Sequence, residues 1–185
     1  MVGDNPRDLM KLARDGDAVA FGKIYTEYFT PVYRYVFVRV RERSLAEDLT
    51  QTVFMKAFAT IEHFQEQGRA PLAYFFTIAR NAITDHWRKK KDLHMTDVED
   101  VMANITDSNP GPRELAEQRE AADQVSALLS ILPEEQKDII ALRFMGDLSH
   151  KEIADLVGKN EATVRQIQSR ALHAIREKFG DLYGI

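Results

Sequence analysis

Polar side chains that can read DNA gather between residues 149 and 178. Arginine can bridge the acceptor atoms of guanine and glutamine can bridge adenine, and basic or hydroxyl side chains bind phosphates. The candidates are Lys151, Glu161, Thr163, Arg165, Gln166, Ser169 and Arg170, with Gln168 on the same polar face. The chemistry they indicate is recognition of duplex DNA.

Two short helices joined by a tight turn would place these side chains on one surface. In the first helix, expected at about 149–157, the residues that share an apolar face are Ile153, Ala154 and Val157. Gly158 supplies the turn, and a second helix at about 160–178 carries the apolar stripe Val164, Ile167, Ala171 and Ile175. The pattern predicts a helix-turn-helix with the second helix as recognition helix. A helical hairpin whose polar face simply meets water would show the same pattern.

A second group of candidates combines aromatic rings with positive charge, from about residue 64 to residue 91. Basic side chains neutralise phosphates and aromatic faces stack on unpaired bases. The basic residues are Arg69, Arg80, Arg88, Lys89, Lys90 and Lys91, and the aromatic ones include Phe64, Tyr74, Phe75, Phe76 and Trp87. At helical spacing most of these rings can also be core, and the lysine run can be a solvated helix end favoured by the helix dipole.

The segment 46–58 is helical in pattern, but its apolar residues cover more than one face. Leu49, Val53 and Ala57 cluster on a helical wheel, whereas Phe54, Met55 and Phe58 lie more than a third of a turn away. Such a helix is either buried centrally in a bundle or uses part of its apolar surface to dock another protein.

The chain as a whole reads as all-α, with two small helical domains. Helices are expected at about 6–15, 17–42, 44–63, 70–91, 113–131 and 133–145 in addition to the two above. The expected start signals are Asp17, a capping box of Ser44 with Glu47, Pro133, a capping box of Ser149 with Glu152, and Asn160. Residues 92–116, which end in a run rich in proline and glycine, are expected to link domains at 1–91 and 117–185.

Charge and composition narrow the possible functions. The first 91 residues carry a net charge of +4, the linker −5 and the remainder −3, so DNA contact must depend on local basic faces. With no cysteine and no ligand spacing among the five histidines, we expect no enzyme activity, no metal and no cofactor. No apolar run approaches the roughly 18 residues of a membrane span, and a cytoplasmic location is expected.

The carboxyl-terminal motifs also resemble a known family. LPEEQKDIIALRF (132–144), LSHKEIADLVG (148–158) and ATVRQIQSRALHAIRE (162–177) are similar to the sigma-factor domain that reads the promoter element around −35. One departure concerns the recognition helix, because the family usually has a basic residue where Ile167 stands and an aliphatic one where Gln168 stands.

The first half resembles the sigma core domain. AEDLTQTVFMKAF (46–58) is similar to the motif that grips the clamp coiled coil of the largest RNA polymerase subunit, which implies polymerase contacts for Asp48, Gln51, Phe54 and Met55. IARNAITDHWRKKK (78–91) resembles the segment that recognises and melts the element around −10. In that family the preceding loop, here about 64–71, captures a flipped base.

With two such domains and a short linker, the chain resembles the extracytoplasmic-function (ECF) group of the sigma-70 family. The resemblance implies a sigma factor that binds core RNA polymerase, through the clamp coiled coil and the beta flap, and directs promoter-specific initiation. Promoter DNA is the implied second partner, and many members are restrained by an anti-sigma factor. The alternatives are a dimeric DNA-binding regulator independent of polymerase, an enzyme, or an interaction protein without a DNA-reading role.

Overall fold

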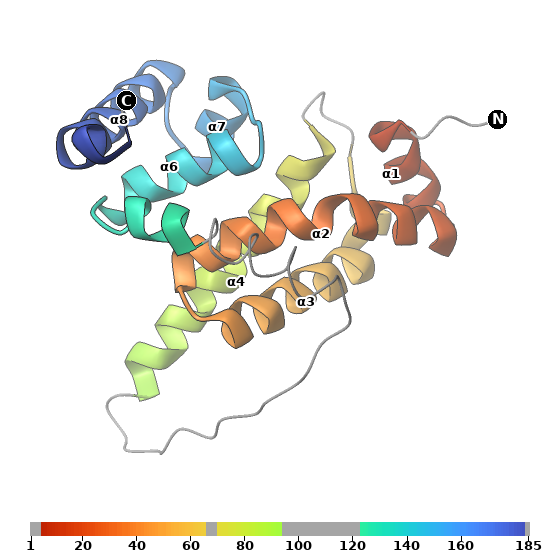
Figure 1. The fold of residues 1–185 in the computed structure, drawn as a ribbon. Coiled ribbons are helices and arrows are strands. Elements are labelled where there is room, and N and C mark those ends of the chain that lie inside the picture. The colour runs from red at the N-terminus through yellow and green to blue at the C-terminus, as the bar shows by residue number, and fades with distance from the viewer. Residues whose placement is uncertain (1–4, 66–69, 94–122, 184–185) are drawn as a thin grey trace.

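A computed structural model describes residues 5–65, 70–93 and 123–183, which form an all-α protein (Figure 1). The helices are α1 (Pro6–Arg14), α2 (Ala18–Val40), α3 (Arg43–Thr60), the short 3-10 helix η1 (Ile61–His63), α4 (Pro71–Leu93), α6 (Glu134–Met145), α7 (His150–Val157) and α8 (Glu161–Tyr183). Residues 123–129 are also helical. The all-α prediction is confirmed, and no helix within the described ranges is long and apolar enough to cross a membrane.

Most of the expected helix starts are confirmed by their hydrogen bonds. The carboxylate of Asp17 accepts from the backbone amides of Val19 and Ala20 at 2.9 and 3.1 Å. Pro133 was expected in the first turn of α6 but is its N-cap residue, and it makes no side-chain cap hydrogen bond. The Asp17 cap fills backbone donors that a helix end leaves without partners.

The capping box expected at Ser44 is wrong. Helix α3 begins at Arg43 with Glu42 as its N-cap, and no side chain caps it. Helix α2 ends at Arg41 in the left-handed conformation, with φ of 61°, which leaves one extended residue before the next helix starts. Ser44 therefore already lies inside the first turn, where its hydroxyl donates to Glu42 at 3.1 Å.

Helices α1 to α4 form the N-terminal bundle, which has an aromatic core. The Phe75 ring lies 5.5 Å from Tyr28 and 5.2 Å from Phe54, and Phe76 lies 5.0 Å from Tyr35. Phe75, Phe76 and Tyr35 are all fully buried. These contacts hold α4 against α2 and α3, and so fix the helix that carries the basic run.

Residues 123–183 form the C-terminal bundle, which packs directly on the first. Helix α6 contacts α2, and α7 contacts α4 (Figure 1). The buried apolar residues of both bundles make one continuous core. The predicted linker, 92–116, lies outside the described residues except for its first two positions, which continue α4.

Candidate DNA- and protein-binding surfaces

The helix-turn-helix is built by three local devices. The Ser149 hydroxyl accepts from the Glu152 amide at 3.2 Å while the Glu152 carboxylate accepts from the Ser149 amide at 2.9 Å, so the predicted capping box is confirmed. Gly158 ends α7 with φ of 70°, a left-handed conformation that glycine adopts without strain. The Asn160 side chain then accepts from the Thr163 amide at 2.8 Å, as expected of a cap for α8.

Helix α8 buries its apolar stripe and exposes its polar face. Val164, Ile167 and Ala171 are buried, with Ile175 partly covered. Six of the seven DNA-reading candidates are exposed, namely Lys151, Glu161, Arg165, Gln166, Ser169 and Arg170, and Thr163 is half-buried. The arrangement leaves one polar face of α8 exposed, and the major groove of DNA is wide enough to admit a helix of this kind.

Sequence reasoning missed part of this face. A hollow of about 510 Å³ beside α8 is lined by His150, Arg165, Gln168, Ser169, Leu172, His173 and Arg176. The last three follow Ser169 at helical spacing, so the period of the polar face could have found them. His150 comes from the other helix of the motif, and no periodicity in α8 points to it.

The departure from the family pattern at Ile167 and Gln168 has a structural explanation. Ile167 is 8% exposed and belongs to the apolar stripe. Gln168 is half-buried, and its Oε1 lies 2.8 Å from Nε2 of His150 at the start of α7. The polar residue therefore joins the two helices of the motif.

The side of α3 that carries the candidate polymerase contacts exposes both polar and apolar side chains. Asp48, Gln51 and Met55 are exposed, and Met55 and Phe58 show 73% and 57% of their surface. Phe58 also meets Phe21 of α2 edge to face, with ring centroids 4.9 Å apart. Two neighbouring apolar side chains in water are a feature of docking surfaces.

Phe54 does not share that exposure. It is 3% exposed, and its ring lies 4.8 Å from Tyr25, 6.1 Å from Phe29 and 5.2 Å from Phe75. The aromatic side chains of α2 cover Phe54, whereas Met55 and Phe58 of the same second apolar face remain exposed. In this conformation the Phe54 ring supports α3 from beneath and is not available to a partner.

The basic end of α4 points its charges to solvent. Lys89 and Lys90 are exposed, and Nζ of Lys90 lies 5.7 Å from the centre of the half-exposed Trp87 ring. Arg88 is exposed and pairs with Asp85 at 3.0 Å. Lys91 is part of α4, and Arg69 lies outside the described residues. The structure thus brings together on one helix most of the expected phosphate contacts.

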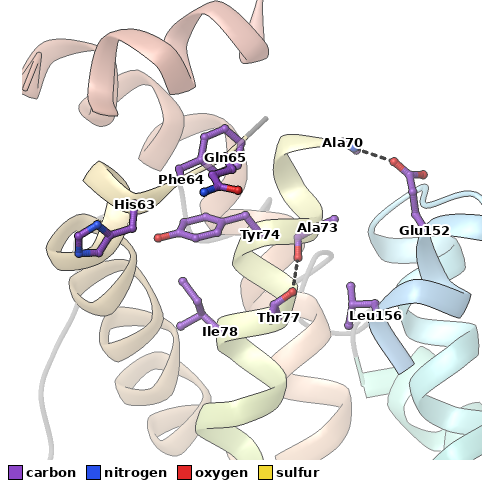
Figure 2. Close-up of a pocket in the computed structure, with 10 residues that line it drawn as sticks. All are labelled: His63, Phe64, Gln65, Ala70, Ala73, Tyr74, Thr77, Ile78, Glu152 and Leu156. Carbon is purple, nitrogen blue, oxygen red and sulfur yellow. Dashed lines mark hydrogen bonds between the residues drawn. The ribbon is translucent and has the colours of Figure 1, made fainter. Parts of the chain in front are cut away.

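A hollow of about 320 Å³ lies at the start of α4, where the family's base-capturing loop was expected (Figure 2). It is lined by His63, Phe64, Gln65, Ala70, Ala73, Tyr74, Thr77 and Ile78, and by Glu152 and Leu156 of α7. Phe64 is half-buried and meets Tyr74 edge to face at 5.4 Å. The Tyr74 hydroxyl lies 2.7 Å from the Thr60 hydroxyl, and burial raises the pKa of Tyr74, which keeps it neutral.

Arg80 is placed differently from the other basic candidates. Its Nε lies 3.0 Å from Oδ2 of Asp138 on α6, and its Nη1 donates to the backbone carbonyl of Leu156 on α7. Both partners belong to the C-terminal bundle. Sequence spacing could not have found them, because they lie far along the chain.

Comparisons with known proteins agree with this arrangement. Residues 24–92 match the family model Sigma-70 region 2, and residues 128–177 match Sigma-70, region 4. The ECF RNA polymerase sigma factor BldN of Streptomyces coelicolor is 35% identical over 175 residues, which cover 94% of this chain and 66% of that protein.

Two solved structures share the fold. CnrH, in complex with the cytosolic domain of CnrY, has a TM-score of 0.70 at 18% identity, with 97% of this chain and 99% of that one covered. The sigma factor RpoE, in complex with the anti-sigma factor NepR from Bartonella quintana, has a TM-score of 0.63 at 22% identity, with 85% and 94% covered. The chain belongs to the ECF group of sigma factors in the sigma-70 family, the factors with which RNA polymerase initiates transcription at specific promoters.

Proposed function

We propose that the two bundles divide promoter recognition between them. The N-terminal bundle docks on the clamp coiled coil of the largest polymerase subunit and opens the element around −10. The C-terminal bundle reads the element around −35 through α8 and contacts the beta flap. The observation that carries this proposal is the exposed polar face of α8 above a buried apolar stripe, held in a capped helix-turn-helix.

The polymerase contact is assigned to the exposed side of α3. Asp48, Gln51 and Met55 lie there, and Phe58 adds apolar area that the sequence assignment did not include. Carboxylate and amide groups beside exposed apolar side chains suit a protein interface with an apolar centre and a polar rim. Phe54 contributes by supporting α3 from the core.

The −10 contact is assigned to the hollow at Phe64 and to the basic end of α4. An unpaired base stacks on an aromatic ring, and Phe64 with Tyr74 offers such rings at the wall of the hollow. Arg88, Lys89, Lys90 and Lys91 would follow the phosphates of the same strand. Arg69 and Arg80 are assigned to contacts with the phosphates of the same strand.

The protein is expected to need polymerase for promoter binding. Its net charge of −4 gives little overall attraction to DNA, and the basic faces are small. Polymerase would hold both bundles in register on one promoter, so that the second contact forms at high effective concentration. An anti-sigma factor, like the one that accompanies RpoE in its solved complex, is the inhibitory partner that we propose for this chain.

The test is transcription by core RNA polymerase with the purified chain on a library of promoter fragments. Run-off transcripts are sequenced to map their starts. We expect selective starts downstream of a shared two-part motif, and a relaxed preference at one or two base pairs of its upstream element with Arg165→Ala but not with Lys178→Ala, an exposed basic position further along α8. Absence of stimulation, with tight binding of the chain alone to duplex DNA, would favour a polymerase-independent regulator.

A further inference from the structure

We infer that Asp138 is the centre of an autoinhibitory clasp, which holds the C-terminal bundle over the −10 surface of the free protein and is opened on polymerase. The clasp is defined as Asp138 with its three partners Tyr35, Arg39 and Arg80. The inference that the clasp inhibits DNA binding rests on the proposed function, whereas the closed conformation itself does not.

The clasp is a buried ionic group shared between the bundles. Asp138 on α6 is 7% exposed. Its Oδ1 accepts from the Tyr35 hydroxyl at 2.6 Å and lies 2.6 Å from Nη1 of Arg39, and its Oδ2 lies 3.0 Å from Nε of Arg80. All three partners belong to the N-terminal bundle. A buried carboxylate is stabilised only by such partners, so separating the bundles must expose it to water.

Two further hydrogen bonds tie α7 to α4. The Glu152 carboxylate, which caps α7, also accepts from the backbone amide of Ala70 at 2.6 Å (Figure 2). Arg80 donates to the carbonyl of Leu156, which lies in the last turn of α7, where helix carbonyls have no partner of their own. The first helix of the DNA-reading motif is thus held by its two ends against the N-terminal bundle.

The apolar packing between the two bundles beside the clasp leaves no space for an added methyl group. A methyl group added at Gly146, the residue after α6, would lie 2.3 Å from Cε2 of Phe76. Phe76 is fully buried in α4. The chain passes this close to the ring only because position 146 carries no side chain, which indicates a fitted interface between the bundles.

The closed conformation competes with DNA at two places. Arg80 cannot bind Asp138 and a phosphate with the same guanidinium edge. Glu152 and Leu156 form part of the wall of the hollow at Phe64 and Tyr74, so α7 occupies one side of the site proposed for the flipped base (Figure 2).

The separation between the two promoter elements also requires the bundles to move apart. Ten base pairs of duplex span about 34 Å, so elements about 25 base pairs apart lie roughly 85 Å from each other. A compact chain of 185 residues has a radius of gyration of about 16 Å and a diameter near 40 Å. The closed protein is too short to reach both promoter elements, and its bundles must separate before both can bind.

The test compares the closed population in wild type and Asp138→Asn. The chain has no cysteine, so Glu62→Cys and Glu177→Cys, both at exposed positions on opposite bundles, can carry a donor and an acceptor dye for single-molecule energy transfer. The matched control is Asp147→Asn, the same charge change at a fully exposed residue of the C-terminal bundle. We expect wild type and control to show mainly one high-transfer state, and Asp138→Asn to raise the low-transfer fraction at least threefold.

Binding measurements then test inhibition. Affinity for a single-stranded −10 oligonucleotide, without polymerase, is reduced in proportion to the closed fraction. We expect Asp138→Asn to bind it at least threefold more tightly than wild type and the control. Adding core polymerase to labelled wild type should shift the dyes to the low-transfer state.

Each outcome has a clear meaning. An unchanged transfer distribution in Asp138→Asn would overturn the clasp, and an opened protein with unchanged oligonucleotide affinity would overturn the inhibition. If Asp138→Asn fails to fold by circular dichroism, Tyr35→Phe removes only one hydroxyl from the clasp and is held to the same two criteria. Failure of the wild type to initiate transcription would refute the proposed function and leave the energy-transfer result standing.

Discussion

The side chain of Gln168 reaches across the helix-turn-helix, so that its Oε1 lies 2.8 Å from Nε2 of His150. His150 begins α7, and Gln168 lies in the first half of α8, at the edge of the face proposed to read DNA. The bond joins the two helices through a polar contact, at a position where the resemblance to the family leads one to expect an aliphatic side chain. It connects a residue of α8 that departs from the family pattern to the stability of the helix-turn-helix.

This pair predicts a measurable coupling. We expect His150→Ala and Gln168→Ala each to lower the free energy of unfolding, and the double-mutant cycle to give a coupling of about 0.5 to 1.5 kcal/mol, the usual range for one hydrogen bond. Urea unfolding followed by circular dichroism measures all four proteins. Gln166→Ala, an exposed neighbour, should change stability by less than about 0.5 kcal/mol. A coupling near zero would show that the two side chains act independently.

Phe54 and Met55 are adjacent on α3 but should respond in opposite ways. Phe54 is 3% exposed in the aromatic core, so Phe54→Ala is expected to lower the free energy of unfolding by about 3 to 5 kcal/mol. Met55 is 73% exposed, so Met55→Ala should change stability by less than about 0.5 kcal/mol and weaken binding to core polymerase. Thermal unfolding and a polymerase pull-down with quantified fractions separate the two effects. Loss of polymerase binding only in a folded Phe54→Ala would contradict this division.

The sequence predicted the parts of this molecule that depend on neighbours along the chain. The caps at Asp17, Ser149 and Asn160 were found because each acts on amides two or three residues away. The buried stripes of α7 and α8 were found because one helical period orders them. Ser44 was misassigned because the start of α3 is set by the left-handed end of α2 at Arg41.

Long-range partners were beyond such reasoning. The apolar pattern of α3 allowed both a core and a docking role for Phe54, and only the rings of α2 decide between them. Arg80 had the type and place of a phosphate contact, but Asp138 lies 58 residues away in sequence. No local pattern marks that aspartate as the partner of three side chains from another bundle.

Arg165 should carry base discrimination in the proposed −35 contact. Its side chain is 62% exposed on α8 and pairs loosely with Glu161 at 3.4 Å, so it is free to exchange that partner for a base. We expect Arg165→Ala to weaken binding of the holoenzyme to its preferred promoters by about 1 to 3 kcal/mol and to relax the preference at one or two base pairs. Sequencing of run-off transcripts from the promoter library gives the base preference, and equilibrium binding of the holoenzyme to a preferred promoter gives the loss of binding free energy. A uniform loss at all promoters would identify Arg165 as a phosphate contact instead.

Glu152 should make the packing of the bundles sensitive to acid. Burial raises its pKa, but hydrogen bonds from Ser149 and from the Ala70 amide outweigh burial, and the net pKa is lowered from 4.5. A carboxylate with a lowered native pKa contributes stability above its unfolded value, and this contribution is lost as the pH falls through the native pKa. Wild type should therefore be more stable than Glu152→Gln at pH 7, and the difference should shrink below about pH 4.5. Chemical unfolding of both proteins between pH 3.5 and 7 measures it, and Ser149→Ala shows how much belongs to the capping box alone. A difference that stays constant over that range would mean that the charge of Glu152 does not stabilise the contact between α7 and α4.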